Sequence, residues 1–277
     1  MTLIELVVTI AVGSVVVAFM ALFIVMPMLS YASQTRRATL VDSADSALRY
    51  IARDVRSALP NSVRVTTSGS VTALELLATI DGARYQANGP LGNPALSLDF
   101  TAADAAFATT VPFTQLSLPW TSSSAYLVIY NVGIPGASAY QMANVITPAG
   151  TTITIAAGAS ANQDLVTLSP AFQFKYGSPG NRVYLVSGPV SYLCDTAAGT
   201  LTRYSGYSIS GTQPVSAATL AAAGATSGVV AAGVASCSFT FNAGTAQRNA
   251  LATLELQLSN AGESVQLLHE VQVVNEP

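Results

Sequence analysis

The chain has 277 residues, of which 51% are apolar and only 9% are charged, and its formal net charge is −3. This length suits one elaborated domain on a stalk, and the negative charge argues against nucleic acid as a partner. Few charges in a composition rich in Ala, Ser, Thr and Gly favour a β-rich domain that works outside the cytoplasm or packs against like subunits.

The first predicted element is an apolar helix. From Leu6 to Leu29 there is no charged residue, and the polar side chains are those of Thr9 and Ser14. About 24 residues at ~1.5 Å each match the ~30 Å hydrocarbon core of a bilayer. We therefore predict a transmembrane segment over residues 1–30.

Glu5 lies at the start of this apolar segment. A charge inside a membrane helix costs about 2.5–3.5 kcal/mol at the centre and less near the end, so such a group is a functional candidate whose partner must be named. The nearest cation is the free α-amino group of residue 1, from the same chain or from a neighbouring copy. The alternative is a plain single-span anchor that tolerates an acid near its end.

The hexapeptide Met1-Thr2-Leu3-Ile4-Glu5-Leu6 resembles the processed N-terminus of type IV pilins and type II secretion pseudopilins, with Met in place of the usual Phe. The resemblance implies that prepilin peptidase removes a leader and that residue 1 is N-methylated. It also implies that Glu5 pairs with the amine of an adjacent subunit when the helices bundle into a filament. Met1, Thr2 and Glu5 are thus the expected processing and assembly residues.

Two residues predict irregularity in the apolar helix. Gly13 weakens the hydrogen-bond ladder locally, and Pro27 lacks a donor and crowds the carbonyl of Phe23. Type IV pilin filaments melt the helix between a glycine and a proline in about this region. Here the proline lies slightly later, and the sequence leaves open whether the stretch unwinds.

Residues 31–60 predict an amphipathic helix that packs on the globular domain. Apolar residues recur at three- and four-residue steps, and Pro60 ends the pattern. Arg36, Arg37 and other arginines fall mostly off this stripe and are interpreted as a solvated face. The stripe consists of Leu40, Ala44, Leu48, Ile51, Val55 and Leu59.

Residues 61–277 predict a β-rich domain, so the fold class is α+β with a type IV pilin-like arrangement of a long helix on a mainly antiparallel sheet. Turn signals include Asp81-Gly82, Asn88-Gly89-Pro90 and the stretch 177–181, and a hairpin is expected across 260–263. The Ala/Gly/Ser/Thr-rich stretch 211–235 is interpreted as a flexible excursion with a short helix around 217–223. The predicted strands are 62–66, 71–78, 125–130, 151–156, 182–186, 190–194, 237–241, 250–258 and 264–274.

A second resemblance lies further along the chain. The stretches 34–38, 59–65, 182–195 and 201–204 look like the O-type minor pilins of mannose-sensitive haemagglutinin pili, which are akin to J-type pseudopilins. These stretches belong to a likeness that covers about half of the chain. Residues 85–180 align with nothing familiar.

Cys194 and Cys237 are the two cysteines. Two thiols in an exported domain usually pair, and this disulfide would close a loop of about 44 residues; the alternative is two separate buried thiols. Pairing places the domain in the periplasm or outside the cell. The positive-inside rule would instead place Arg36 and Arg37 in the cytoplasm, and a removed basic leader resolves this conflict.

The sequence offers little for catalysis. His269 is the one histidine, and there is no Gly-x-Ser-x-Gly elbow, phosphate loop, dinucleotide fingerprint or calcium loop. One histidine and two cysteines are too few for a zinc site. We therefore expect no catalytic residues, no metal and no cofactor. Trp120, beside four hydroxyl residues, is the candidate for contact with a glycan or surface, and a core or rim tryptophan is the alternative.

Together these features predict a non-enzymatic structural subunit of a type IV pilus, favoured as a minor, tip or assembly-priming pilin. The alternatives are a major pilin, a type II secretion pseudopilin, or an adhesin displayed on the pilus. The expected partners are other pilin subunits, prepilin peptidase and the inner membrane before assembly, with a surface or glycan ligand as a further candidate. The globular domain is then periplasmic or extracellular.

Overall fold

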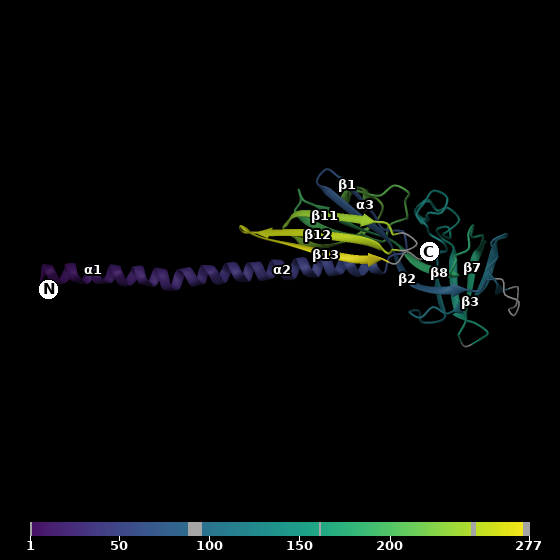
Figure 1. Cartoon of the computed structure of the whole chain (residues 1–277), viewed down its shortest axis with the longest axis horizontal. Helices are drawn as coiled ribbons and strands as arrows, with labels where there is room; N and C mark the ends of the chain where they lie inside the picture. The colour runs from purple at the N-terminus through teal and green to yellow at the C-terminus, as the bar shows by residue number, and fades with distance from the viewer. Residues whose placement is uncertain (1, 88–95, 161, 245–247, 274–277) are drawn as a thin grey trace.

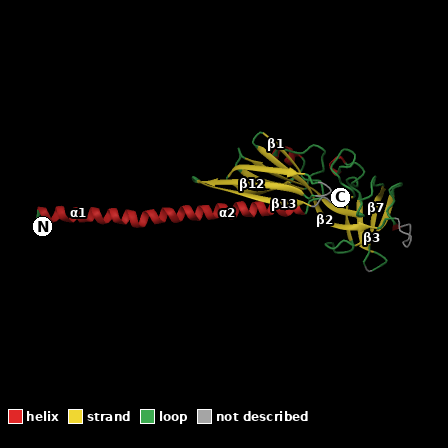
Figure 2. Cartoon of the chain, viewed as in Figure 1, coloured by secondary structure: helices red, strands yellow, loops and turns green. Residues whose placement is uncertain are grey.

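A computed structural model describes residues 2–87, 96–160, 162–244 and 248–273. A long helix projects from one end of a domain built of antiparallel strands (Figures 1 and 2). The α+β class predicted from the sequence is therefore confirmed. Met1 and the turn signal Asn88-Gly89-Pro90 lie outside the described residues.

The helix runs from Leu3 to Arg56 in three segments. They are α1 (Leu3–Met20), a π-helical turn η1 (Ala21–Val25) and α2 (Met26–Arg56). Within the described residues, it is the helix that is long and apolar enough to cross a membrane. The helix ends at Arg56, four residues before Pro60 and earlier than predicted, so Leu59, the last residue of the predicted stripe, lies beyond it.

The second half of α2 is amphipathic and packs on a three-stranded sheet. All six residues of the predicted stripe are buried, and Ile51, Val55 and Leu59 have no exposed surface. The sheet has the order β11-β12-β13 and supplies alternating inward side chains such as Leu254 and Leu256. Its strands are β11 (Val234–Asn242), β12 (Ala250–Asn260) and β13 (Glu263–Val273).

A larger antiparallel sheet forms the rest of the domain. In the described part of the chain it has the order β10-β9-β8-β2-β3-β7-β6-β4, with β1 beside β2 and β5 beside β8. Its strands are β1 (Arg64–Ser68), β2 (Val71–Tyr85), β3 (Asp104–Val111), β4 (Trp120–Ser122), β5 (Tyr126–Val128), β6 (Thr152–Ala157), β7 (Asp164–Phe172), β8 (Arg182–Asp195), β9 (Thr200–Ser205) and β10 (Thr226–Ala232). Two short helices, η3 (Ala139–Gln141) and α3 (Ala217–Ala222), lie in the connections.

Two large and two smaller clusters of buried side chains share the long strands β2 and β8. The proximal core holds the stripe from Leu40 to Val55, the inner face of β11–β13, and the halves of β2 and β8 around Leu74 and Tyr192. The distal core holds the other halves, around Tyr85 and Leu185, together with side chains of β3, β5, β6 and β7 such as Phe107. The distal lobe lies at the end of the molecule opposite α1 (Figure 1).

β2 and β8 are longer than the sequence predicts. Asp81-Gly82, predicted as a turn, lies inside β2, where Asp81 accepts hydrogen bonds from the amides of Gly82 at 2.7 Å and Gln115 at 2.6 Å. The runs 182–186 and 190–194 are one strand, although Gly188 and Pro189 separate them. β5 pairs with β8 up to Val186 and β9 only from Val190, so the proline falls where β8 has one neighbouring strand.

The stretch 211–235 is more regular than predicted. It contains α3, close to the predicted 217–223 helix, and the whole of β10, so its interpretation as a flexible excursion is wrong. The strand forms because its backbone pairs with β9, and a run of small side chains does not predict such pairing. The β12–β13 hairpin is confirmed, and Asn260 pairs with Glu263 across Ala261 and Gly262, which both have positive φ.

Candidate functional site: the exposed apolar helix

The helix α1 carries the apolar surface of the molecule. None of its residues is buried against the rest of the chain, and Leu3 is 83% exposed. Its hydroxyls bond to the helix's own backbone, since Thr9 donates to the Leu6 carbonyl and Ser14 to the Ala11 carbonyl, both at 2.8 Å. We call this exposed apolar helix the rod. Its hydroxyl groups already have hydrogen-bond partners, so its surface suits contact with lipid or with other helices.

Glu5 supplies the charge on this surface. The Thr2 amide donates to Glu5 Oε2 at 3.3 Å, and the Glu5 and Leu6 amides donate to the Thr2 carbonyl. A carboxylate in the first turn also interacts favourably with the helix dipole. Glu5 is thus positioned to close its own helix end, while Met1, its expected assembly partner in a neighbouring chain, lies outside the described residues.

The helix irregularity lies next to Pro27 rather than at Gly13. Gly13 sits inside regular α-helix, and a Cβ atom there would meet nothing within 4 Å. The π-helical turn Ala21–Val25 comes directly before Pro27 in the first turn of α2. A wider turn accommodates the missing N–H and the crowded carbonyl one turn before a proline, so the chain stays helical through this region.

The disulfide predicted between Cys194 and Cys237 is confirmed, with an S–S distance of 2.01 Å. It joins β8 of the large sheet to β11 of the three-stranded sheet. Both strands line the proximal core, which also holds the stripe from Leu40 to Val55. By loop-closure entropy alone a crosslink of this span contributes about 3–4 kcal/mol, so it fixes the sheet on which the helix rests.

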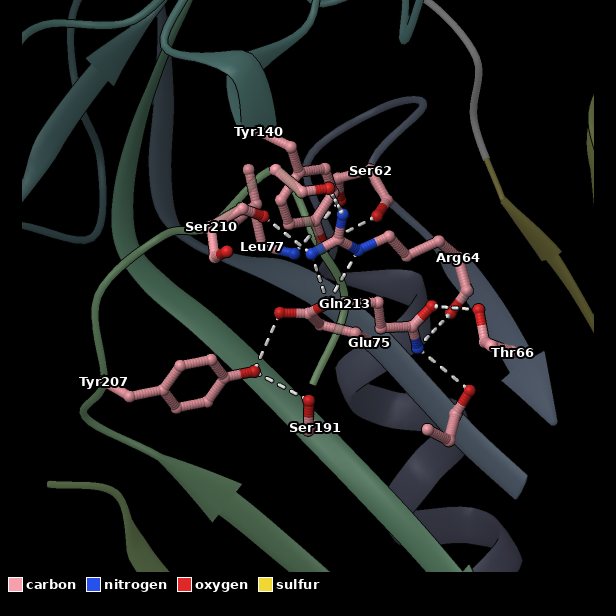
Figure 3. A network of polar contacts seen from close by, with 12 residues as sticks. Ser62, Arg64, Thr66, Glu75, Leu77, Tyr140, Ser191, Tyr207, Ser210 and Gln213 are labelled. Carbon is pink, nitrogen blue, oxygen red and sulfur yellow. Dashed lines mark hydrogen bonds and ion pairs between the residues drawn. The ribbon is translucent and has the colours of Figure 1, made fainter. Parts of the chain in front are cut away.

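A buried ion pair that the sequence analysis missed lies between β1 and β2 (Figure 3). The Arg64 guanidinium meets Glu75 Oε2 at 2.6 Å and stacks 3.6 Å from the centre of the Tyr140 ring. The Tyr207 hydroxyl donates to Glu75 Oε1 at 2.9 Å. Glu75 has no exposed surface. Burial raises the pKa of Glu75, although Arg64 and the Tyr207 hydrogen bond oppose this shift.

The same arginine fastens the segment that follows β9. Its terminal nitrogens donate to the carbonyls of Ser210 and Gly211, each at 2.8 Å. The Gln213 amide donates to the carbonyls of Arg64 and Ala73. Full pairing of a buried charge offsets its desolvation, so we assign this network a structural role. The signal that could have found it is Glu75 itself, a lone acid inside the apolar run 73–77.

A second polar cluster ties α2 to the large sheet. Asp54 on α2 accepts hydrogen bonds from the Tyr192 hydroxyl at 2.7 Å and from Arg203 Nε at 3.0 Å. Beside it a groove with a volume of about 470 Å³ runs between α2 and the edge strand β10, lined by Tyr50, Arg203 and Val229 among others. This groove could not be predicted from the sequence, because the strand β10 gives no strand signal there.

The remaining candidate residues lie apart from one another. Trp120 is half-buried in β4 opposite Ile155 and packs against the distal core, so its position fits the predicted alternative of a rim tryptophan. Its proposed contact with a glycan stays a prediction. His269 is half-buried in β13, opposite Leu254. Across the described residues, no group of three or more His, Cys, Asp or Glu side chains could hold a metal ion.

The arrangement separates an exposed, apolar, singly charged rod from a disulfide-fixed domain with its distal lobe at the far end. Such a rod can be buried by lipid or by like helices. Compared with protein-family models, curated proteins and solved structures, the chain has no significant match.

Proposed function

We propose that this chain is a structural subunit of a type IV pilus-like filament, anchored in the inner membrane before assembly and polymerised through its N-terminal helix. The observation that carries the proposal is α1, whose apolar surface is unburied in the single chain and bears one carboxylate at Glu5. The hexapeptide 1–6 supports it through its resemblance to processed pilins.

The partner proposed for Glu5 is the residue-1 amine of a neighbouring copy. When apolar helices bundle, a buried carboxylate and a buried ammonium each lose hydration, and pairing them offsets both desolvation costs at once. The contact with the Thr2 amide, at 3.3 Å, leaves a formal negative charge that a hydrogen bond from a neutral amide does not cancel. The remaining charge on Glu5 therefore favours association with a second chain that supplies a cation.

Within the filament we favour a minor, tip-proximal or priming role. The domain extends through a distal lobe placed at the end opposite α1, where a filament would present it outward (Figure 1). The likeness of 182–195 and 201–204 to O-type minor pilins points the same way. The proposal assigns the chain no catalytic activity: it works by contact between subunits and by surface display.

The test exchanges Glu5 in the full chain expressed with its assembly system. Glu5→Ala should insert in the membrane normally but enter sheared filaments at least about tenfold less, the ratio that a loss of about 1.4 kcal/mol predicts. Membrane fractions and filament fractions are compared by immunoblot. Incorporation at the wild-type level would contradict the proposal.

Two further variants separate the charge from the helix cap. Glu5→Gln keeps an oxygen that can accept from the Thr2 amide but removes the charge, so the proposal expects it to fail like Glu5→Ala. If capping were the role of Glu5, Glu5→Gln would assemble normally. Ser14→Ala is the matched control, because its hydroxyl already bonds to the Ala11 carbonyl within the same helix.

A further inference from the structure

At the junction between the apolar rod and the domain, apolar, aromatic and basic side chains follow one another in the order found at a membrane surface. The apolar run ends at Leu29, Tyr31 follows with 74% of its surface exposed, and Arg36 and Arg37 come next. Aromatic residues favour the interface between lipid and water, and arginine side chains reach back to it from just outside. From the sequence alone, these arginines are interpreted only as part of a solvated face.

The helix geometry places Arg36 at the headgroup layer if residues up to Leu29 fill the hydrocarbon core. Arg36 is the seventh residue after Leu29, about 10 Å farther along the axis. The headgroup region adds about 5–8 Å on each side of the core. The Cα–Cβ bond of a helical residue tilts toward the N-terminus, which for Arg36 is the direction of the bilayer.

The two arginines differ in their partners. Arg37 pairs with Glu263 at 3.0 Å, at the tip of the β12–β13 hairpin, which reaches farther toward the N-terminal end than the other strands (Figure 1). Arg36 lies one helical turn before Leu40 on the side that faces the sheet. It is half-buried, and its Nε atom has no hydrogen-bond partner among the described residues. Among the described residues Arg36 forms no ion pair with an acid, whereas Arg37 pairs with Glu263.

We propose that Arg36 binds the phosphate of an anionic phospholipid headgroup in the leaflet next to the domain, before the subunit leaves the membrane. A guanidinium forms bidentate, charge-assisted hydrogen bonds with phosphate oxygens. The ion pair between Arg37 and Glu263 limits this binding to Arg36, because the acid of Glu263 neutralises the charge of Arg37 at the membrane surface. The inference rests on the membrane anchorage in the proposed function.

The experiment reconstitutes the full chain in phosphatidylcholine vesicles that contain a trace of spin-labelled phosphatidylglycerol or spin-labelled phosphatidylcholine. The fraction of motionally restricted label gives the preference of the protein for the anionic lipid. One arginine near an anionic surface contributes about 1 kcal/mol, which converts to a preference of about fivefold in low salt. The wild type should show about this preference, and Arg36→Gln should bring it close to one.

Two variants sharpen the assignment. Glu263→Gln releases Arg37 from its ion pair and should raise the preference above the wild-type value. Arg56→Gln is the matched control, since the same change lies about 30 Å farther along the same helix and should leave the preference unchanged. An equal loss for Arg56→Gln and Arg36→Gln would mean that overall charge acts, and would overturn the site.

Two controls distinguish the sources of failure. Exchange of chloride for inorganic phosphate at constant ionic strength should not lower the preference; a lower preference would mean that a free anion binds, which overturns the lipid assignment. Flotation after alkaline extraction reports anchorage by itself. An anchored wild type without lipid preference overturns this inference and leaves the proposed function standing, whereas a chain that fails to float removes the basis of both.

Discussion

Two acids illustrate how the surroundings of a residue decide its role. Glu5 and Glu75 each interrupt an apolar run, so at the level of sequence they give the same signal. Glu75 is enclosed within its own chain, where Arg64 and Tyr207 both bind its carboxyl group and so supply its partners. Glu5 meets only a backbone amide among the described residues. Glu5, which meets no cation among the described residues, is the acid that we assign to assembly.

The pH dependence of folding should report the buried position of Glu75. Burial raises its pKa above the usual 4.5, so the folded chain holds this proton more tightly than the unfolded chain does. The contribution of the protonated group to stability is complete below pH 4.5, and it declines as the pH rises through the pKa of the folded state. The stability of the wild type relative to Glu75→Gln should therefore fall as the pH rises above about 4.5, by about 1.4 kcal/mol per unit of pKa difference.

Urea unfolding of both proteins across this pH range measures that difference. A chain lacking residues 1–30 is suitable for the measurement, because no buried apolar residue of the described structure precedes Leu40. A difference that grows with pH would mean that Arg64 lowers the pKa of Glu75 more than burial raises it.

Ile51 tests whether the α2 stripe is true core. It has no exposed surface and lies between α2 and the inner face of β11–β13. Ile51→Ala should lower the free energy of unfolding by about 2–5 kcal/mol, through lost transfer energy and the cavity left behind. Val41 on the same helix is 38% exposed, so Val41→Ala should cost well under 1 kcal/mol. Equal effects of the two changes would show that the stripe mainly packs against other subunits.

At the scale of elements, the sequence predicts what its periodicity or turn chemistry encodes. The α2 stripe has the helical period of apolar residues, and the β12–β13 hairpin carries alternation on both sides of a glycine-containing turn. β10 has neither signal, because Thr226–Ala232 consists of small and β-branched residues without alternation and its order comes from β9. Breaks within a strand mislead equally, as Gly188 and Pro189 do inside β8.

The stability of the domain should depend on Gly188, in the middle of β8. Its φ of +133° is a backbone conformation that side chains other than glycine rarely adopt. Gly188→Ala should therefore destabilise the domain by about 1–3 kcal/mol. Gly228→Ala in β10 is the comparison, since that glycine has no positive φ and a Cβ atom there meets nothing within 4 Å. Thermal unfolding of the two variants should separate them clearly, and equal melting temperatures would contradict the expectation.

At the scale of the molecule, the sequence predicts the division into an apolar helix and a globular domain better than it predicts how the interior of the domain packs. The apolar rod, the helix that continues from it and the disulfide could all be derived from residues 1–60 and two cysteines. The distal core could not, since its side chains come from strands that are far apart in the chain, such as β3 and β7. The Arg64–Glu75 network was missed for a similar reason, because its members span β1, β2 and the segment after β9.

This division predicts that the rod is dispensable for folding. Removal of residues 1–30 should leave a monomeric domain in aqueous solution with unchanged thermal stability, whereas the full chain should need detergent or lipid. The reason is that none of α1 is buried against the domain. Size-exclusion chromatography with light scattering and circular dichroism measure both properties. Aggregation or a molten domain after the truncation would show that the apolar helix also supports the core.

The path of the chain through β2 and β8 has a consequence for how the far end can change. The chain enters the distal lobe along β2 and returns along β8, and these two strands are direct neighbours in which Ala78 faces Gly188. The lobe is therefore a cassette carried on a double-stranded stem, with both splice points side by side. An insert of different shape can be joined at these two adjacent backbones if it keeps the contacts that Asn131 and Tyr140 make with residues 60–64. In the filament proposed above, subunits with different lobes could then share the same polymerising helix.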